Sequence, residues 1–422
     1  MKKLFFCCVL SFALAGVASA QSGTNSPYSQ YGLGVLADQS QGFSRGMNGA
    51  GLGLRRGNIV NTLNPASYSA IDSLTMIFDM GVSGQVTNFK EGPVKVNARN
   101  TNFDYVVGCF RLFPKVGVAF GLLPFSNMGY KYTSSKYLDS TNGTLTETYS
   151  GDGGLHQFFV GAGWQVSKQL SVGANVSYLW GSLSHGMTTS STTYINSLER
   201  SYSVQVTSYT ADLGVQWEQK LNKNDALTVG ATVGIGHKLG ADPSCMVVNA
   251  SNKDTVTHTL TNGLSIPMKF ALGAAWTKGR QWVVDADLSM ENWGSLDFPE
   301  LTSDGQYAMR SGILKNRYQI RAGADFVPNF MDRKFLKRVH YRWGVGYATP
   351  YYNINGKNGP TELSVSAGFG IPLQNSYNNR SQLNVSAQFV RVSAKDMIRE
   401  NTFRLNIGLT FNERWFAKWK ID

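Results

Sequence analysis

The side chains most able to do chemistry in this sequence are nine ionisable residues between positions 285 and 342. They lie in three consecutive segments and mostly alternate there with apolar residues. The nine are Asp285, Asp287, Glu291, Arg317, Arg321, Asp325, Arg338, His340 and Arg342. If these segments are adjacent antiparallel strands, opposite charges come within cross-strand reach. The set then forms either an arginine-rich site for a carboxylate head group or a structural network, and we favour the network because buried charges generally need partners.

Patterns typical of enzymes and metal sites are missing around the other reactive residues. No GxSxG, HExxH or paired-carboxylate motif accompanies a histidine. The five histidines are His156, His185, His237, His258 and His340. Beyond residue 20, Cys109 and Cys245 are the remaining cysteines, which allow one disulfide and have no metal-ligand spacing. We therefore expect no catalytic residues, no enzymatic activity, no metal and no cofactor.

The N-terminus carries the pattern of an exported protein. Lys2 and Lys3 precede an apolar run from 4 to 17, and Ala18-Ser19-Ala20 follows it. These features predict a signal peptide over residues 1–20 that is cleaved after Ala20. No later stretch has the roughly 18 uncharged apolar residues of a transmembrane helix. The composition of the whole chain is also unusual for a soluble protein: 16% of its 422 residues are charged and 45 are Gly, against about 25% charged and 7% Gly in soluble domains.

The elements that would position the ionisable residues are long strands. Trp282, Val284, Ala286 and Leu288 alternate with polar neighbours, and this period of two recurs along the chain. It predicts fourteen strands, near 73–87, 102–112, 115–124, 155–166, 169–182, 202–218, 225–240, 260–276, 280–291, 313–327, 337–349, 361–372, 381–392 and 400–411. Most have ten or more residues, whereas strands of globular proteins average about 5–6 and membrane strands about 9–11.

The connections between these strands alternate between longer and shorter, as in outer-membrane barrels with long outer loops and short periplasmic turns. We therefore predict an all-β fold: a transmembrane antiparallel barrel over 73–411 in the outer membrane of a Gram-negative bacterium. Aromatic residues near strand ends fit the two interfacial girdles of such a barrel. Residues 412–422 are expected to form a periplasmic tail.

Residues 21–72 precede the barrel and are rich in Gly, Ser and Asn. A barrel of fourteen strands is wider than the eight-stranded size that side chains fill. We therefore predict that 21–72 form a hatch that plugs the lumen, the alternative being a disordered periplasmic tail. In this arrangement the nine ionisable residues face the lumen, and the network that we favour holds the hatch.

The segment Asn64-Pro65-Ala66, shortly before the first of fourteen strands, resembles the FadL/TodX family of outer-membrane transport barrels. The resemblance covers the mature chain in architecture and three residues with their context in sequence. It implies that Asn64, Pro65 and Ala66 belong to a hatch and ligand region and that fatty acids or aromatic hydrocarbons pass through the barrel. Ser26-Pro27-Tyr28 and Arg45-Gly46-Met47 also resemble barrels of Bacteroidota, where some FadL-like members act in secretion or assembly.

Pro124 closes the third predicted strand and bears on mechanism. Proline cannot donate to a strand ladder and occurs at edges, strand ends or bulges. A strand broken at Pro124 would open a lateral gap toward lipid, as the kinked third strand does in FadL-like barrels. The alternative, which we favour, is that Pro124 merely ends the strand above the membrane.

These observations predict a barrel that passes hydrophobic small molecules, such as fatty acids, across the outer membrane. The alternative is a non-transporting subunit of an outer-membrane secretion or protein-assembly complex. A third class, an adhesin-like or structural barrel, also stays open. The expected partner is outer-membrane lipid. Further candidate partners are a hydrophobic small-molecule ligand and other outer-membrane or periplasmic proteins. The formal net charge of +12 fits anionic head groups; the basic residues are too scattered for nucleic acid.

Overall fold

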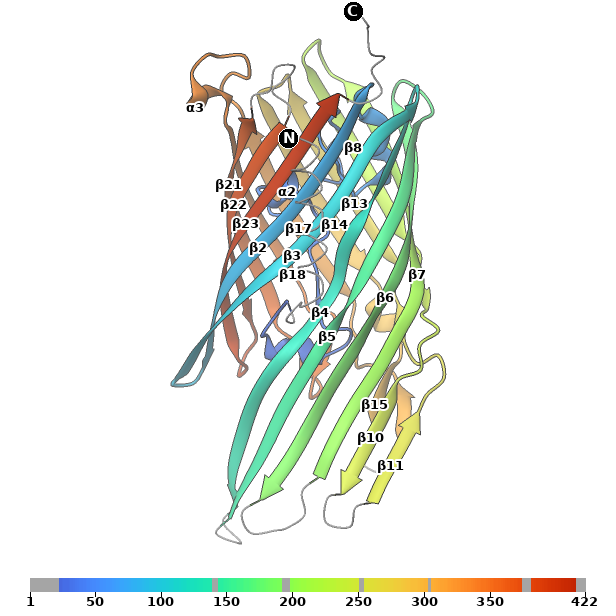
Figure 1. Ribbon diagram of the computed structural model, residues 1–422, viewed down its shortest axis with the longest axis vertical. Coiled ribbons are helices and arrows are strands. Elements are labelled where there is room, and N and C mark those ends of the chain that lie inside the picture. Colours follow the sequence, from blue (N-terminus) through green and yellow to red (C-terminus); the bar gives the residue numbers. More distant parts are fainter. Residues whose placement is uncertain are drawn as a thin grey trace, which may run out of the picture.

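A computed structural model describes residues 23–138, 143–191, 198–249, 254–302, 305–373 and 381–414 and shows an antiparallel barrel (Figure 1). Its first and last strands pair from Thr75–Arg414 to Lys90–Arg399, which closes the wall. Fourteen strands of the described part form the wall: β2 (Thr75–Glu91), β3 (Val94–Phe113), β4 (Val116–Leu138), β5 (Gly143–Gln165), β6 (Leu170–Ser191), β7 (Leu198–Lys220), β8 (Asp225–Gly234), β13 (Lys269–Lys278), β14 (Trp282–Glu291), β17 (Arg317–Phe326), β18 (His340–Ala348), β21 (Thr361–Leu373), β22 (Ser381–Ser393) and β23 (Arg399–Arg414). The predicted fourteen-stranded barrel is confirmed.

The wall has two different rims. The turn rim carries short connections such as 114–115 and 279–281, together with the end of β23, and the opposite loop rim carries the longer excursions. The loop-rim elements are β9 (His237–Lys238), β10 (Ser244–Asn249), β11 (Asp254–Thr259), β12 (Ser265–Ile266), η3 (Trp293–Ser295), β15 (Phe298–Leu301), β16 (Tyr307–Arg310), β19 (Asn353–Ile354) and β20 (Lys357–Asn358). The short helix α3 (Phe335–Arg338) lies on the turn rim.

Alternation sorts the wall residues into two faces. On β13, Phe270 and Leu272 are exposed on the outside, while Ala271 and Ala275 are buried toward the lumen. The outward face is apolar, whereas the inward face carries small and polar side chains together with apolar ones such as Ile77 and Phe159 that are buried. An apolar outer face is the pattern of a wall that meets lipid. Among the described residues, no helix has the length and apolar character needed to cross a membrane.

Several strands extend much further toward the loop rim than the sequence predicts. The region 125–154, predicted as an outer loop, is mostly strand, because β4 continues to Leu138 and β5 begins at Gly143. The region 241–259 likewise contains β10 and β11. These parts are rich in Ser, Thr and Tyr, so they lack the apolar alternation by which membrane strands are found, although Thr and Tyr favour strands.

Residues 23–74 lie inside the barrel, and we call them the hatch segment. It contains η1 (Pro27–Gln30), β1 (Val35–Leu36), α2 (Gly42–Arg45) and η2 (Pro65–Ala70). Pro occupies the first position of both 3-10 helices, and the side chains of Ser26 and Asn64 cap them by accepting from Tyr28 N and Ala66 N. Most of the segment is buried against the wall, so it fills the lumen rather than hanging below it.

Candidate functional site

A belt of glycines on the lumen side of the wall seats the hatch segment. At each of these positions a Cβ atom would collide with a hatch residue. The belt comprises Gly117, Gly163, Gly173, Gly214, Gly230, Gly273, Gly323 and Gly344, on strands β4 to β8, β13, β17 and β18. Most are paired across strands, for example Gly117 with Gly163 and Gly163 with Gly173. The main chain of the hatch therefore lies directly against the main chain of the wall over much of the circumference.

The closeness of this contact is clearest at two glycines. A Cβ at Gly117 would lie 1.9 Å from the carbonyl oxygen of Tyr68, and one at Gly230 would lie 2.0 Å from that of Leu52. No side chain fits at such a distance without moving the hatch. The belt explains much of the glycine excess of the chain, and it leaves no layer of water or side chains between hatch and wall at these points.

Polar contacts fix the hatch in addition. Asp287 on β14 accepts hydrogen bonds from the backbone N–H groups of Gly51 (2.7 Å) and Leu52 (3.1 Å). The Asn64 side chain donates to the carbonyls of Leu52 (3.1 Å) and Val215 (3.0 Å). Each of these groups is buried, where an unmade hydrogen bond is costly, so they bind the hatch in one position.

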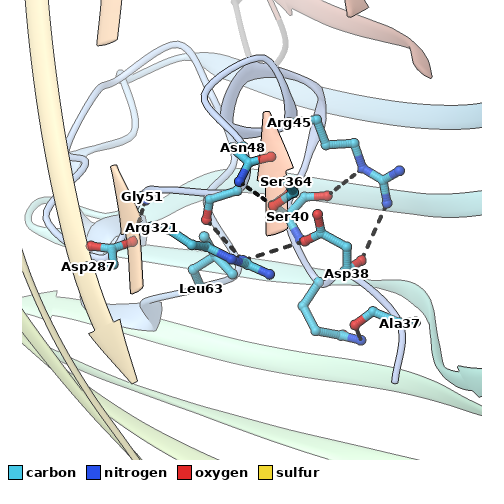
Figure 2. Close-up of polar contacts among 12 residues, drawn as sticks. Ala37, Asp38, Ser40, Arg45, Asn48, Gly51, Leu63, Asp287, Arg321 and Ser364 are labelled. Carbon is cyan, nitrogen blue, oxygen red and sulfur yellow. Dashed lines mark hydrogen bonds and ion pairs between the residues drawn. The ribbon is translucent and has the colours of Figure 1, made fainter. Parts of the chain in front are cut away.

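Charged contacts connect the hatch to opposite sides of the wall, and Figure 2 shows the one between Arg321 and Asp38. The Arg45 side chain is largely buried, with its guanidinium 2.8 Å from Asp104 on β3, and it also donates to the carbonyl of Ser40 at 3.0 Å. Across the lumen, Arg321 on β17 lies 3.7 Å from Asp38 and donates to the carbonyl of Gly49. Burial raises the pKa of Asp38, but the guanidinium groups of Arg321 and Arg45 outweigh it and hold that pKa at about 2.

A seam divides the wall between β3 and β4. Their pairing runs from Phe113–Val116 at the turn rim to Val106–Leu122 and stops there. Seven residues of β4 correspond to about 24 Å of strand, fewer than the roughly 9–11 residues that cross a membrane. Beyond this point, the described residues pair with β4 through β5 on its other side and through the short β1. The seam therefore begins within the membrane-spanning part of the wall.

The start of the hatch segment fills this seam. β1 pairs with β4 at Val35–Asn127 and Leu36–Ser126. Gly23 lies between the side chains of Asn102 on β3 and Asn127 on β4, and the Asn25 side chain donates to that of Asn100. The protein's own N-terminal part is thus bonded to both strand edges of the seam, through two backbone pairs on β4 and the Asn100 side chain on β3.

Pro124 lies beside this seam, within β4 rather than at its end. The register between β4 and β5 shifts between Pro124 and Ser126, which marks a bulge. The favoured expectation that Pro124 merely ends the strand is therefore wrong. The Gln39 side chain donates to the Pro124 carbonyl (2.7 Å), and Ala37 N donates to Phe125 O (3.0 Å), so the hatch satisfies the carbonyls at the bulge.

Between the hatch and the wall, the described part of the lumen holds a cavity, and a packed apolar cluster lies nearby. The cavity has a volume of about 370 Å³. Its lining mixes charged side chains, among them Asp38, Arg45, Asp104, Arg317, Glu400 and Arg404, with apolar ones such as Leu123, Phe159 and Tyr351. Ligand pockets for apolar molecules are lined mainly by apolar side chains, whereas this lining is polar and apolar in similar measure. Toward the loop rim, Trp293, Tyr351, Leu179 and Leu183 belong to an apolar cluster that packs across the mouth.

The surplus length of β4 to β7 builds a sheet beyond the barrel, which we call the projecting sheet (Figure 1). On β6, every second residue faces outward. These outward residues are apolar from Val172 to Trp180 and polar or Gly from Ser182 to Ser190. The apolar band thus spans nine residues, the length of a membrane crossing. β10 extends the same sheet by pairing with β7, and β11 pairs with β10. Its lumen-side face carries stacked rings, among them Tyr132–Tyr149 and His185–Tyr202.

The nine ionisable residues found in the sequence do not form a single ladder. Asp325 bonds to His340 (2.9 Å) and Arg342 (2.9 Å), and it lies 3.5 Å from Arg56 of the hatch. Glu291 pairs with Arg317 at 3.5 Å, separately from this group. Asp285 is fully buried next to Asp287. Arg338 was expected in a strand that faces the lumen and is instead the last residue of α3 on the turn rim.

Other predicted residues are also placed by the structure. Asn64, Pro65 and Ala66 form the buried start of η2 against the glycine belt. Cys109 and Cys245 are free and buried. Within the described residues, no group of three or more His, Cys, Asp or Glu side chains could hold a metal ion. The signal peptide and residues 415–422 of the predicted tail lie outside the described residues, while 412–414 belong to β23.

The sequence did not reveal the contacts of Arg45, Asp38 and Arg56. These residues belong to the hatch segment, which has no periodicity from which an inward or outward direction follows. Arg45 occurs in the Arg45-Gly46-Met47 segment of the resemblance, which was the only available signal.

The BamG family model matches residues 1–422. The chain belongs to the BamG family. Comparison with curated protein sequences gives no match.

Solved structures show that the BamG-family chain shares its fold with FadL/TodX-type barrels, as the sequence resemblance predicts. The toluene transporter TbuX of Ralstonia pickettii and a FadL homologue of Pseudomonas aeruginosa each give a TM-score of 0.62 at 14% identity, covering 90% of this chain and 99% of theirs. The toluene transporter TodX of Pseudomonas putida gives 0.58 at 16% identity, covering 90% of this chain and 100% of its own.

Proposed function

We propose that this BamG-family protein is a non-enzymatic, non-transporting barrel subunit of an outer-membrane protein-assembly or secretion complex. It would sit in the outer membrane of a Gram-negative bacterium with the turn rim toward the periplasm, since an exported chain with both barrel ends on one rim is threaded from that side. The name of the family, BamG, also supports a role in an assembly complex. The projecting sheet would be the surface that meets a partner outside the membrane.

The projecting sheet is the observation that carries the proposal. After the apolar band of β6 ends at Trp180, eleven more residues continue the strand to Ser191. They contribute nothing to membrane crossing, and an ordered sheet of this size costs conformational entropy to hold. A barrel that only encloses a passage has no need of it, whereas a subunit needs a rigid surface beyond the head groups.

The closed lumen supports the proposal from the other direction. The hatch is seated against the glycine belt, fixed by the enclosed Arg45–Asp104 pair (2.8 Å) and capped by an apolar cluster at the mouth. Moving it would break buried charge pairs, which costs about 3–5 kcal/mol when one partner is lost. A gate that opens for each passing molecule is expected to be held less firmly.

A shortened hairpin tests this function. Residues 131–150 would be replaced by Asn-Gly, which joins the paired residues Tyr130 and Gly151 and keeps the register of β4 and β5. The protein would be tagged, cross-linked in its own bacterium and purified. We expect an equimolar partner with the natural chain and at least a ten-fold loss of it with the shortened chain, while the barrel keeps its resistance to unfolding in cold detergent.

The matched control shortens the β2–β3 hairpin in the same way, by replacing 88–97 between the paired residues Thr87 and Ala98. This control is expected to retain the partner. A natural chain that purifies as a monomer without any equimolar protein contradicts the proposal.

The second candidate is passage of hydrophobic small molecules, and the seam between β3 and β4 favours it. Hydrocarbons that reached the lumen could leave sideways there if the start of the hatch moved away. Uptake of radiolabelled fatty acid and toluene would be compared with and without the protein and with Pro124→Ala. We expect equal uptake in all three; a ten-fold fall without the protein, together with altered uptake in P124A, would establish transport instead.

A further inference from the structure

The connection between β17 and β18, residues 327–339, exposes an apolar patch on the turn rim. We call it the α3 loop. Met331 is 78% exposed, Leu336 68% and Phe335 49%. Exposing three large apolar side chains of one thirteen-residue connection to water is energetically unfavourable. Exposed apolar patches rimmed by polar residues mark interaction surfaces.

The patch lies beside the outer face of the wall rather than over the lumen. The hydroxyl of Tyr341, at the turn-rim end of β18, donates to the carbonyl of Leu336 at 3.0 Å. The Tyr341 ring contacts Phe369 of β21 edge to face at 5.8 Å. Phe369 and its neighbour Trp343 are about half exposed on the lipid-facing side. Figure 1 shows α3 standing outside the wall at this rim, level with an aromatic girdle.

Basic residues surround the apolar side chains. The α3 loop contains Arg333, Lys334, Lys337 and Arg338 against one acid, Asp332. Asp332 also shapes the loop, because its carboxylate accepts from Lys334 N (2.8 Å) and pairs with Lys337 (3.1 Å). The adjoining turn, 279–281, adds Arg280, whose guanidinium lies 5.4 Å from the centre of the Phe330 ring.

The two turns form one rigid unit. Val327 N donates to the Gln281 carbonyl (2.8 Å), and the Gln281 side chain donates to the Pro328 carbonyl (3.1 Å). The position of the patch is therefore fixed relative to the wall. An apolar surface at the level of an aromatic girdle, with cations around it, matches the boundary where acyl chains meet anionic head groups.

We propose that the α3 loop is an interfacial anchor that binds an acidic phospholipid of the leaflet on the turn-rim side. Met331, Phe335 and Leu336 enter the acyl-chain boundary, and Arg333, Lys334 and Arg280 contact the phosphate from the head-group side. The anchor goes beyond the proposed function and does not depend on it, since it concerns the rim opposite the projecting sheet. It would fix the rotation and depth of the barrel in the bilayer.

Native mass spectrometry of the purified, delipidated full-length protein tests the charged part. The protein would be titrated with phosphatidylglycerol or with phosphatidylcholine. We expect phosphatidylglycerol to bind more tightly, and the variant R280Q/R333Q/K334Q to weaken that binding by on the order of 100-fold at low salt, since each basic residue near an anionic surface contributes about a five-fold effect. The matched control K95Q/K131Q/K136Q, which removes three exposed lysines near the loop rim, is expected to bind like the natural chain.

A fluorescent label tests the depth of the loop. Leu336→Cys and, as a control on the projecting sheet, Thr133→Cys would be labelled and placed in liposomes containing brominated lipid; the two native cysteines are buried. We expect strong quenching at 336 and none at 133. Equal lipid binding by both triple variants, or an unquenched label at 336, overturns the proposal. Loss of an equimolar protein from R280Q/R333Q/K334Q, with lipid binding intact, would assign the loop to a protein partner instead.

Discussion

Strands β6 and β13 belong to the same wall, yet β6 has 22 residues and β13 has 10. The outward residues of β13 are apolar over nearly its whole length, from Phe270 to Trp276. β6 has a band of similar length, from Val172 to Trp180, and then a polar continuation. The membrane therefore sets the length of β13 and only the first half of β6. The difference separates the part of the molecule built for lipid from the part built for something else.

The two sides of the wall also hold the hatch differently. On the β3 side, the Arg45–Asp104 pair is enclosed at 2.8 Å. On the β17 side, Arg321 is partly exposed and lies 3.7 Å from Asp38. Breaking a short, buried charge pair costs more free energy of folding than breaking a longer, partly hydrated one. The hatch is thus held most firmly beside the seam, where the wall is least complete.

The largest effect is expected from deleting residue pairs within the apolar band. Removing Gly273-Ala274 from β13 with the facing Ala286-Asp287 from β14 should abolish the folded barrel, because the band becomes too short and the hatch loses Asp287. Removing Thr133-Ser134 with Glu147-Thr148 from the projecting sheet should leave a folded barrel. Gel mobility of unheated samples measures both. Equal loss of folding would mean that the two parts of the wall have the same role.

Truncating the two arginines sharpens the comparison of the hatch contacts. Arg45→Ala should lower the free energy of unfolding by about 3–5 kcal/mol, since it leaves Asp104 buried without its partner. Arg321→Ala should cost clearly less, since its pair with Asp38 is longer and partly exposed. Urea unfolding in detergent micelles gives both values. A larger loss of unfolding free energy for Arg321→Ala than for Arg45→Ala would contradict the prediction.

Charges placed on the outer face locate the edge of the membrane. Val176→Lys on β6 and Val345→Lys on β18 should each cost about 2–4 kcal/mol, as lipid-facing lysines do near the bilayer midplane. Ser184→Lys, four residue pairs further along the outward face of β6, should cost close to nothing. Unfolding in lipid vesicles measures all three. A similar cost at Ser184 would place the projecting sheet within the bilayer.

The smallest effect concerns pH. The pKa of Asp38 is held at about 2 in the folded protein, below its ordinary value of 3.8, so the charged carboxylate stabilises the hatch above pH 3.8. This contribution, about 2 kcal/mol, is lost as the pH falls from 3.8 through 2. Asp38→Asn should remove this part of the acid sensitivity. Unfolding midpoints of the natural chain and of Asp38→Asn would be measured between pH 2 and 6. The same dependence on pH in both proteins would contradict the stabilising role of the Asp38 carboxylate.

The wall could be predicted from the sequence because lipid and lumen impose a period of two. The expected segment 361–372 coincides with Thr361–Leu373, for example. The projecting parts were missed because both of their faces are largely polar, as in Ser182 to Ser191. Arg338 was misplaced because it continues the alternation of β18 by two residues while belonging to α3.

The hatch site was the least predictable part. Asn64, Pro65 and Ala66 were found through a family resemblance, not through any physical pattern. The partners of Arg45 and Asp38 are distant in sequence, and nothing in an aperiodic segment says which wall strand it will meet. The nine ionisable residues were found by alternation, but their division into separate groups depends on the hatch residues that contact them, such as Arg56 at Asp325.

The glycine belt has a consequence for how this sequence can vary. At Gly117 and Gly230 the wall meets main-chain carbonyl oxygens of the hatch, so neither partner of the contact is a side chain. A larger residue at either position cannot be compensated by a smaller residue in the hatch, because there is no side chain there to shorten. Gly117 and Gly230 should therefore be unchanging among relatives rather than co-varying with hatch residues, and Gly230→Ala should yield no suppressor by side-chain replacement at Leu52.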